Sequence, residues 1–176
     1  MPKRVVGAIV AAVFIGFSGV VEGADATEKK LMRFTMEDQF SKRYTEKDLA
    51  GKLILMMASD KGGSGYSEEW ALAIQDYVAK MKDTKPVNVV ACLQLSDIPE
   101  ILRGGIKRLM PREKEKRVLM DWKDAFIKPY GLVKNKCNIL VFNKMGDLIY
   151  QVAVTKYKSS KAQDIAKVIA KEQQKE

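Results

Sequence analysis

An uninterrupted apolar run, Leu53–Ala58, comes just before a glycine-rich segment at 60–65. A run of this length between turn residues is typical of a strand buried on both faces. Ser67 is a candidate helix N-cap, and apolar residues then repeat at helical spacing to Met81. A second apolar run follows at 87–95. Strand, helix and strand at this spacing predict a βαβ unit with parallel strands and a right-handed crossover.

Shorter elements are predicted around this unit, and together they indicate an α/β protein. Residues 46–50 and 60–65 are expected to be connections without regular structure. A helix after Pro99 is expected to bury one apolar face, formed by Ile101, Leu102, Ile106 and Leu109. The remaining predicted elements are strands at 34–38, 42–45 and 118–121, a short helix at 122–130, a hairpin of 138–143 with 148–154, and a final helix capped by Ser159 or Ser160.

Residues 1–26 have the pattern of a secretory signal peptide. Lys3 and Arg4 precede an uncharged apolar stretch, 5–21, and Ala24-Asp25-Ala26 is a small-x-small cleavage pattern. An uncleaved anchor is the alternative, because about 17 residues lie at the short limit for a spanning helix. We expect residues 27–176 to form a single domain in the bacterial periplasm, with membrane contact only through 5–21 if the signal is retained.

The amino-acid composition excludes several kinds of site. The 176 residues contain no histidine and two cysteines, which is too few for a tetrahedral zinc site or a disulfide scaffold. The net charge of +9 is compatible with acidic partners or anionic lipid but identifies neither. We expect no metal, no cofactor and no nucleic acid, and we expect the partner to be another envelope protein. The basic segment 107–117 is interpreted as a contact for lipid or an acidic partner, or as a solvated loop.

Three stretches carry a resemblance to a known family. They are Phe34–Asp38 followed by Asp48–Lys52, the turn Tyr130-Gly131-Leu132, and the strand and turn Ile139–Asp147. These resemble the thioredoxin-like superfamily, in particular the redoxin type that includes peroxiredoxins and periplasmic thiol-disulfide exchangers. The resemblance implies a three-layer α/β fold with a mixed central sheet and an N-terminal β-hairpin extension.

The sequence departs from that family where its chemistry would lie. The resemblance implies a cysteine or Cys-x-x-Cys after the central strand, but residues 59–66 contain no thiol. A hydroxyl such as Ser64 cannot replace it, because exchange needs a thiolate. The family's cis-proline before the penultimate strand is also absent, and with one inserted residue Cys137 takes its position. Peroxide chemistry and disulfide exchange by the usual route are therefore excluded unless Cys137 acts in a new way.

Cys137 is the candidate catalytic residue. If it is exposed near Lys61 or a helix start, its pKa would fall and it could form mixed disulfides. The alternative is a buried, inert thiol. Cys92 lies in the middle of a strand and is expected in the core. The central strand separates the two cysteines in the expected topology, so no disulfide is expected between them, because bridged Cα atoms lie within roughly 7 Å.

The glycine segment supplies the candidates for ligand or partner binding, which are Asp60, Lys61, Gly62, Gly63, Ser64, Gly65 and Tyr66. Bare backbone N–H groups before a helix favour an anion, although the spacing is not that of a P-loop. The alternative is a flexible loop that replaces a lost active site.

Two functional hypotheses follow from these residues. The first is an exported redoxin-like protein without the catalytic cysteine pair, which has a non-catalytic binding or accessory role in the periplasm. The second is a one-cysteine thiol-disulfide oxidoreductase or antioxidant redoxin that acts through Cys137 and a partner thiol.

Overall fold

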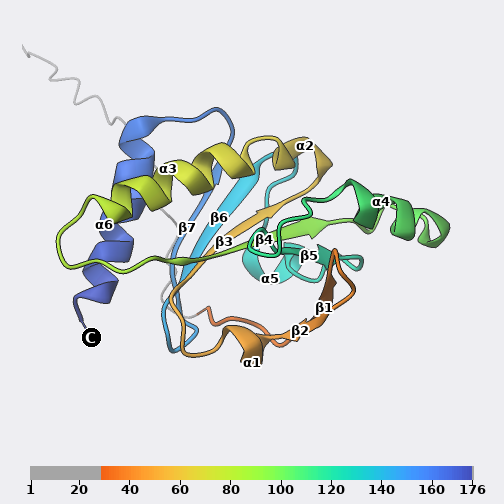
Figure 1. The fold of residues 1–176 in the computed structure, drawn as a ribbon, viewed down its shortest axis with the longest axis horizontal. Coiled ribbons are helices and arrows are strands. Elements are labelled where there is room, and N and C mark those ends of the chain that lie inside the picture. The colour runs from red at the N-terminus through yellow and green to blue at the C-terminus, as the bar shows by residue number, and fades with distance from the viewer. Residues whose placement is uncertain (1–28, 176) are drawn as a thin grey trace, which may run out of the picture.

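The computed structural model describes residues 29–175, which form a seven-stranded mixed sheet with helices on its faces (Figure 1). The predicted signal peptide, 1–26, lies outside the described residues. Within 29–175 no helix is both long and apolar enough to cross a bilayer. The elements are β1 (Thr35–Asp38), β2 (Arg43–Thr45), α1 (Glu46–Leu49), β3 (Ile54–Ser59), α2 (Lys61–Ser64), α3 (Ser67–Ala79), β4 (Asn88–Gln94), η1 (Glu100–Leu102), α4 (Arg103–Leu109), β5 (Val118–Asp121), α5 (Ile127–Tyr130), β6 (Cys137–Phe142), β7 (Leu148–Val154) and α6 (Ser159–Gln173).

The central βαβ unit forms as the apolar pattern predicts. The strand order is β2-β1-β5-β4-β3-β6-β7. Strand β3 pairs parallel with β4 and antiparallel with β6, and all six of its residues are buried. A strand with neighbours on both sides and helices or loops on both faces buries every side chain, which explains the uninterrupted apolar run from Ile54 to Ala58. Ser59 at its end is buried too, and its hydroxyl is paired with that of Ser67.

The two faces of the sheet belong to two separate apolar cores, because side chains alternate along each strand. Ile54, Met56 and Ala58 of β3 face a core that contains Phe126 and Tyr130 near α5. Leu55 and Met57 face the other core, which contains Trp70 of α3 and Ile165 of α6. Helices α3 and α6 lie together on that second face (Figure 1). The result is the expected three-layer arrangement.

The N-terminal hairpin extends the sheet at one edge. Strand β1 pairs antiparallel with β2 and also with β5, where Glu37 lies opposite Met120. Strand β5 in turn pairs parallel with β4. The sheet is therefore mixed and carries an N-terminal β-hairpin extension, which confirms the predicted fold class.

Both segments that were expected to lack regular structure form single helical turns. Residues 46–49 form α1, because Thr45 and Asp48 make a capping box in which the Asp48 carboxylate accepts the Thr45 backbone N–H at 2.7 Å. Residues 61–64 form α2, capped by Asp60. In both segments a nearby aspartate, Asp48 or Asp60, stabilises the helical turn by accepting a backbone N–H group.

The helix predicted at 122–130 is wrong in its first half. The buried Asp121 carboxylate accepts the backbone N–H groups of Lys123, Ala125 and Phe126, which fixes an irregular turn before α5 begins at Ile127. The predicted N-caps are wrong, because Ser67 is the first residue of α3, and Ser159 and Ser160 are the first two residues of α6. The irregular turn at 122–126 follows from Asp121, because its carboxylate binds backbone N–H groups that a helix would otherwise use.

The prediction for the helix after Pro99 is correct in position and wrong in orientation. Residues 100–109 form η1 and α4. Ile101 and Leu109, which were expected to be buried, are 91% and 78% exposed. Leu102 is also exposed, and only Ile106 of the predicted apolar face is half-buried. Arg103 and Lys107 contact the body of the protein from this segment.

Candidate functional site

The carboxyl end of β3 is joined to the loop before β6 by one side chain. Asp60 follows β3 directly and accepts the Gly63 backbone N–H with Oδ1, at 2.8 Å. Its Oδ2 accepts the Asn135 backbone N–H, also at 2.8 Å. Both carboxylate oxygens therefore serve to hold α2 against the segment that leads to Cys137.

The glycines of α2 are required by close packing. A Cβ on Gly63 would lie 2.1 Å from the Lys136 carbonyl oxygen, and a Cβ on Gly62 would lie 2.2 Å from Asn135 Oδ1. At Gly63 the contact is with backbone, so only a residue without a side chain allows this approach, whereas at Gly62 the contact is with the Asn135 side chain. The segment is a packed helical turn, and its Gly63 N–H is already bound by a carboxylate, which argues against an anion cradle at this place.

Cys137 is close to the glycine segment but is fully buried. It begins β6, its exposed fraction is 0%, and Ser67 Oγ donates to its Sγ at 3.4 Å. Burial raises the pKa of the Cys137 thiol to about 11, although the Ser67 hydroxyl opposes this shift. A thiol with this pKa is protonated near neutral pH and is a poor nucleophile.

Cys92 is equally buried and lies on the opposite face of the sheet. It belongs to the core beside Phe126, whereas Cys137 belongs to the core beside Trp70. Burial raises the pKa of Cys92 well above its ordinary value, and the carboxylates of Asp121 and Asp124 add to that shift. Both thiols are free, so the expectation that they form no disulfide is confirmed.

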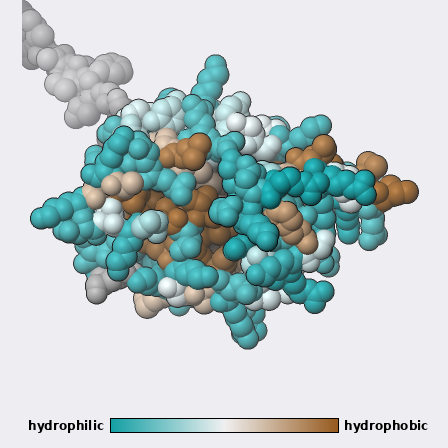
Figure 2. All heavy atoms as spheres, viewed as in Figure 1, coloured by the Kyte–Doolittle hydropathy of each residue, from teal (hydrophilic) through white to brown (hydrophobic). Residues whose placement is uncertain are grey.

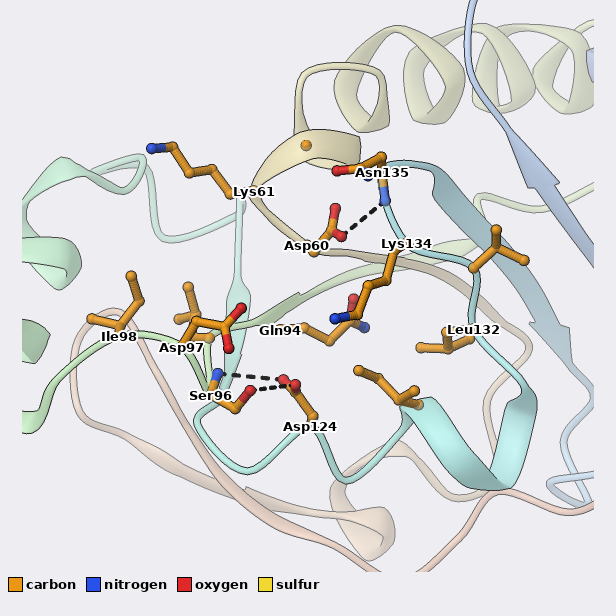
Figure 3. A pocket seen from close by; sticks show the side chains of 14 residues that line it. Asp60, Lys61, Gln94, Ser96, Asp97, Ile98, Asp124, Leu132, Lys134 and Asn135 are labelled. Atoms are coloured by element: carbon orange, nitrogen blue, oxygen red, sulfur yellow. Dashed lines mark hydrogen bonds between the residues drawn. The ribbon is translucent and has the colours of Figure 1, made fainter.

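A pocket of about 580 Å³ opens at the carboxyl ends of β3 and β4 (Figure 3). Leu95, Ile98, Ile127, Leu132 and Val133 form its apolar lining, and charged side chains surround them. Ser96 binds Asp124 through both its backbone N–H and its hydroxyl. Neither cysteine lines this pocket.

Gln94, the last residue of β4, carries an unsatisfied amide in this pocket. Its exposed fraction is 8%, and its Nε2 has no hydrogen-bond partner within residues 29–175. Figure 3 shows its side chain between Asp60 and Lys134 on one side and Ser96 and Asp124 on the other. A buried donor without an acceptor is costly unless a ligand or water supplies one.

The structure brings together only part of the predicted binding set. Asp60, Lys61 and Gly62 line the pocket, whereas Gly63 is packed against Lys136. The other three predicted residues are Ser64, Gly65 and Tyr66, which do not line it. Tyr66 packs instead against the core beneath α3.

Sequence reasoning missed the residues that come from other elements, which are Gln94, Ser96, Asp124 and Lys134. One available signal was a polar residue at the carboxyl end of the strand next to β3, because ligands of open α/β sheets bind there. Gln94 is such a residue, because it ends β4, the strand next to β3. The other three residues lie in loops whose placement depends on tertiary contacts.

Within residues 29–175 no group of three histidine, cysteine, aspartate or glutamate side chains could hold a metal ion. No peptide bond in this range is cis. The position that the resemblance assigns to a cis-proline is therefore occupied by a trans Cys137.

No protein-family model and no curated protein sequence matches the chain. Among solved structures, it is similar to a putative thiol:disulfide interchange protein DsbE from Chlorobium tepidum, with 16% identity, a TM-score of 0.59, and coverage of 84% of this chain and 97% of that one. It is also similar to the exposed lipoprotein thioredoxin Etrx1 of Streptococcus pneumoniae, with 18% identity, a TM-score of 0.53, and coverage of 77% and 98%. A third is copper-bound ScoI of Arabidopsis thaliana, with 14% identity, a TM-score of 0.57, and coverage of 80% and 98%. The chain thus has a thioredoxin-like fold.

Proposed function

We propose that this chain is an exported thioredoxin-fold protein that binds a ligand, or a segment of another envelope protein, without thiol chemistry. One observation carries the proposal: a pocket of about 580 Å³ lies at the carboxyl ends of the two central parallel strands, and neither thiol reaches it. The similar DsbE and lipoprotein thioredoxin structures support an extracytoplasmic setting only by analogy of fold.

The chemistry of the pocket limits what can bind. Apolar side chains such as Leu132 and Ile98 favour an apolar portion of the ligand. The unpaired Gln94 Nε2 favours an acceptor such as a carbonyl or carboxylate oxygen at the buried end. A short extended peptide segment has both features.

A one-cysteine enzyme that acts through Cys137 is the competing hypothesis, and the geometry disfavours it. The thiol is fully buried, and its pKa of about 11 leaves little thiolate at neutral pH. A partner disulfide would need β6 and α3 to separate before it could reach Sγ.

Two measurements test the proposal. Insulin reduction in the presence of dithiothreitol is expected to proceed no faster with the wild-type protein than with Cys137→Ser. Turnover that is lost in Cys137→Ser would overturn the non-catalytic assignment.

Binding is followed by NMR titration with short unstructured peptides, using the backbone amides of the pocket residues Leu95 and Asn135 as reporters in the wild type and in the variants. Shifts confined to the pocket, and affinity lowered at least tenfold by Gln94→Leu, are expected, because the substitution keeps a similar volume and removes the donor. Lys82→Leu, at an exposed residue that does not line the pocket, is the control. Absence of pocket shifts with every peptide would overturn the binding role.

A further inference from the structure

Segment η1–α4 projects from one end of the molecule (Figure 1) and carries exposed apolar side chains. Ile101, Leu102 and Leu109 are 91%, 53% and 78% exposed. Figure 2 shows hydrophobic surface at this end, next to hydrophilic surface. Single exposed apolar residues are ordinary, but several large ones within one short segment indicate a contact surface.

Two basic side chains hold the segment to the protein. The Arg103 guanidinium lies 5.1 Å from the centroid of the Trp122 ring. Lys107 Nζ lies 2.7 Å from Glu37 Oε2 and 2.9 Å from Ser41 Oγ. Arg103 and Lys107 are one helical turn apart and therefore share a face. Ile106 and Met110 are half-buried on the same side, so the inward face of this segment is mixed. An ordinary surface helix covers its large apolar side chains, whereas this segment leaves Ile101, Leu102 and Leu109 outside.

Free positive charge accompanies the exposed apolar residues. Residues 99–117 contain seven basic and three acidic side chains. Lys107 and Lys116 are used in ion pairs with Glu37 and Glu68. Arg108, Arg112 and Lys114 are exposed, and no ion pair holds them within residues 29–175.

We propose that η1–α4 is a membrane-contact element that inserts Ile101, Leu102 and Leu109 into the interface of an anionic lipid bilayer. Arg108, Arg112 and Lys114 then lie at the level of the headgroups. A projecting apolar tip with cations beside it is the arrangement of an interfacial anchor. An anionic bilayer complements these three cations and accepts apolar side chains without a shaped pocket, whereas a protein partner would have to supply a well-packed pocket for each of them. The proposal uses no residue of the Gln94 pocket and does not depend on the proposed function.

Site-specific fluorescence tests the proposal on the full chain. Cys92 and Cys137 are buried, so a surface cysteine introduced as Ile101→Cys can be labelled selectively with a polarity-sensitive nitrobenzoxadiazole dye. Vesicles of 30% phosphatidylglycerol in phosphatidylcholine are expected to raise its emission several-fold and shift it to the blue. Pure phosphatidylcholine vesicles are expected to produce little change.

The charge requirement is tested in the same labelled protein. Changing Arg108, Arg112 and Lys114 together to Gln is expected to weaken the vesicle response by roughly 100-fold in lipid concentration, because each cation near an anionic surface contributes about a fivefold gain in affinity. An unchanged response would remove the electrostatic part of the proposal and thereby overturn it as stated.

Leu72→Cys provides the matched control for position. Leu72 is 58% exposed on α3, with Glu68, Glu69 and Asp76 one turn away on either side. Its dye is expected to stay unchanged, even if residues 5–21 tether the chain to the vesicle.

A silent dye at 101, or equal responses at 101 and 72, would overturn the proposal. A dye at 101 that responds only to an acidic protein would also overturn it, in favour of a protein partner. Leu109→Cys repeats the test if Ile101→Cys fails to fold by circular dichroism.

Discussion

Helices α3 and α4 follow the two central parallel strands, yet only α3 covers its large apolar side chains within the chain. Helix α3 buries Trp70, Ile74 and Val78 against the sheet, and its acidic first turn faces solvent. Helix α4 holds Lys107 inward on Glu37 and leaves Leu109 outside. Apolar periodicity therefore predicts that a helix has an apolar face, but the available partner decides whether that face is covered within the chain.

The largest expected effect comes from removing the main apolar contact of α3. Trp70→Ala should lower the free energy of unfolding by about 4 kcal/mol, because a fully buried indole is lost together with its Nε1 hydrogen bond to the Thr155 carbonyl at 2.8 Å. Ile101→Ala on η1 should change it by less than about 0.5 kcal/mol, because the side chain is exposed. Urea unfolding of both variants checks the contrast, and a large cost for Ile101→Ala would show that this segment packs against the protein.

A second contrast concerns two glycines near the site. Gly63→Ala should lower the free energy of unfolding by about 2 kcal/mol, because its Cβ would meet the Lys136 carbonyl oxygen at 2.1 Å and no flexible side-chain end can yield. Gly65→Ala has no atom within 4 Å of its Cβ and should be close to neutral. Denaturant midpoints measure both, and similar values for the two variants would contradict the close approach of α2 to the β6 loop.

Most of the fold could be predicted from the sequence because it depends on local patterns. The uninterrupted run Leu53–Ala58 indicates a strand buried on both faces, and the order of elements indicates a mixed sheet. The capped turn at 46–49 was missed, because one side-chain pair, Thr45 and Asp48, stabilises it where periodicity is absent.

The site and the orientation of α4 were harder to predict because they depend on contacts between distant residues. Glu37 and Lys107 are 70 positions apart, and Asp60 reaches Asn135 across 75 positions. No local sequence pattern predicts such distant pairs. The sequence therefore identified Asp60 and Cys137 as neighbours through the resemblance, but it could not show that both are already occupied with internal contacts.

The buried junction around Cys137 should also be sensitive to alkaline pH. The pKa of this thiol is raised from 9.0 to about 11 in the folded protein, so both states hold the proton below pH 9 and the full stabilisation is present there. Between pH 9 and 11 the unfolded chain loses its proton first, and stability falls, by about 1 kcal/mol at pH 10.

The measurement compares the free energy of unfolding of wild type and Cys137→Ser between pH 8 and 10.5, because the serine hydroxyl does not titrate in this range. The decrease should be steeper in the wild type, and Cys92 contributes equally to both proteins. Parallel pH profiles would show that the Cys137 thiolate is tolerated in the folded state, which would revive the one-cysteine enzyme.

The smallest expected effect has the opposite sign and lies in α4. A Cβ added to Gly104 would have no atom within 4 Å, and this residue does not have a positive φ. Gly104→Ala should therefore raise the free energy of unfolding by about 0.5 kcal/mol, because alanine restricts the unfolded chain and favours helix. Urea unfolding, with hydrogen exchange of the α4 amides, measures the gain locally as well as globally. A loss of stability would mean that the outward side of α4 is packed, and the contrast between the two helices would then disappear.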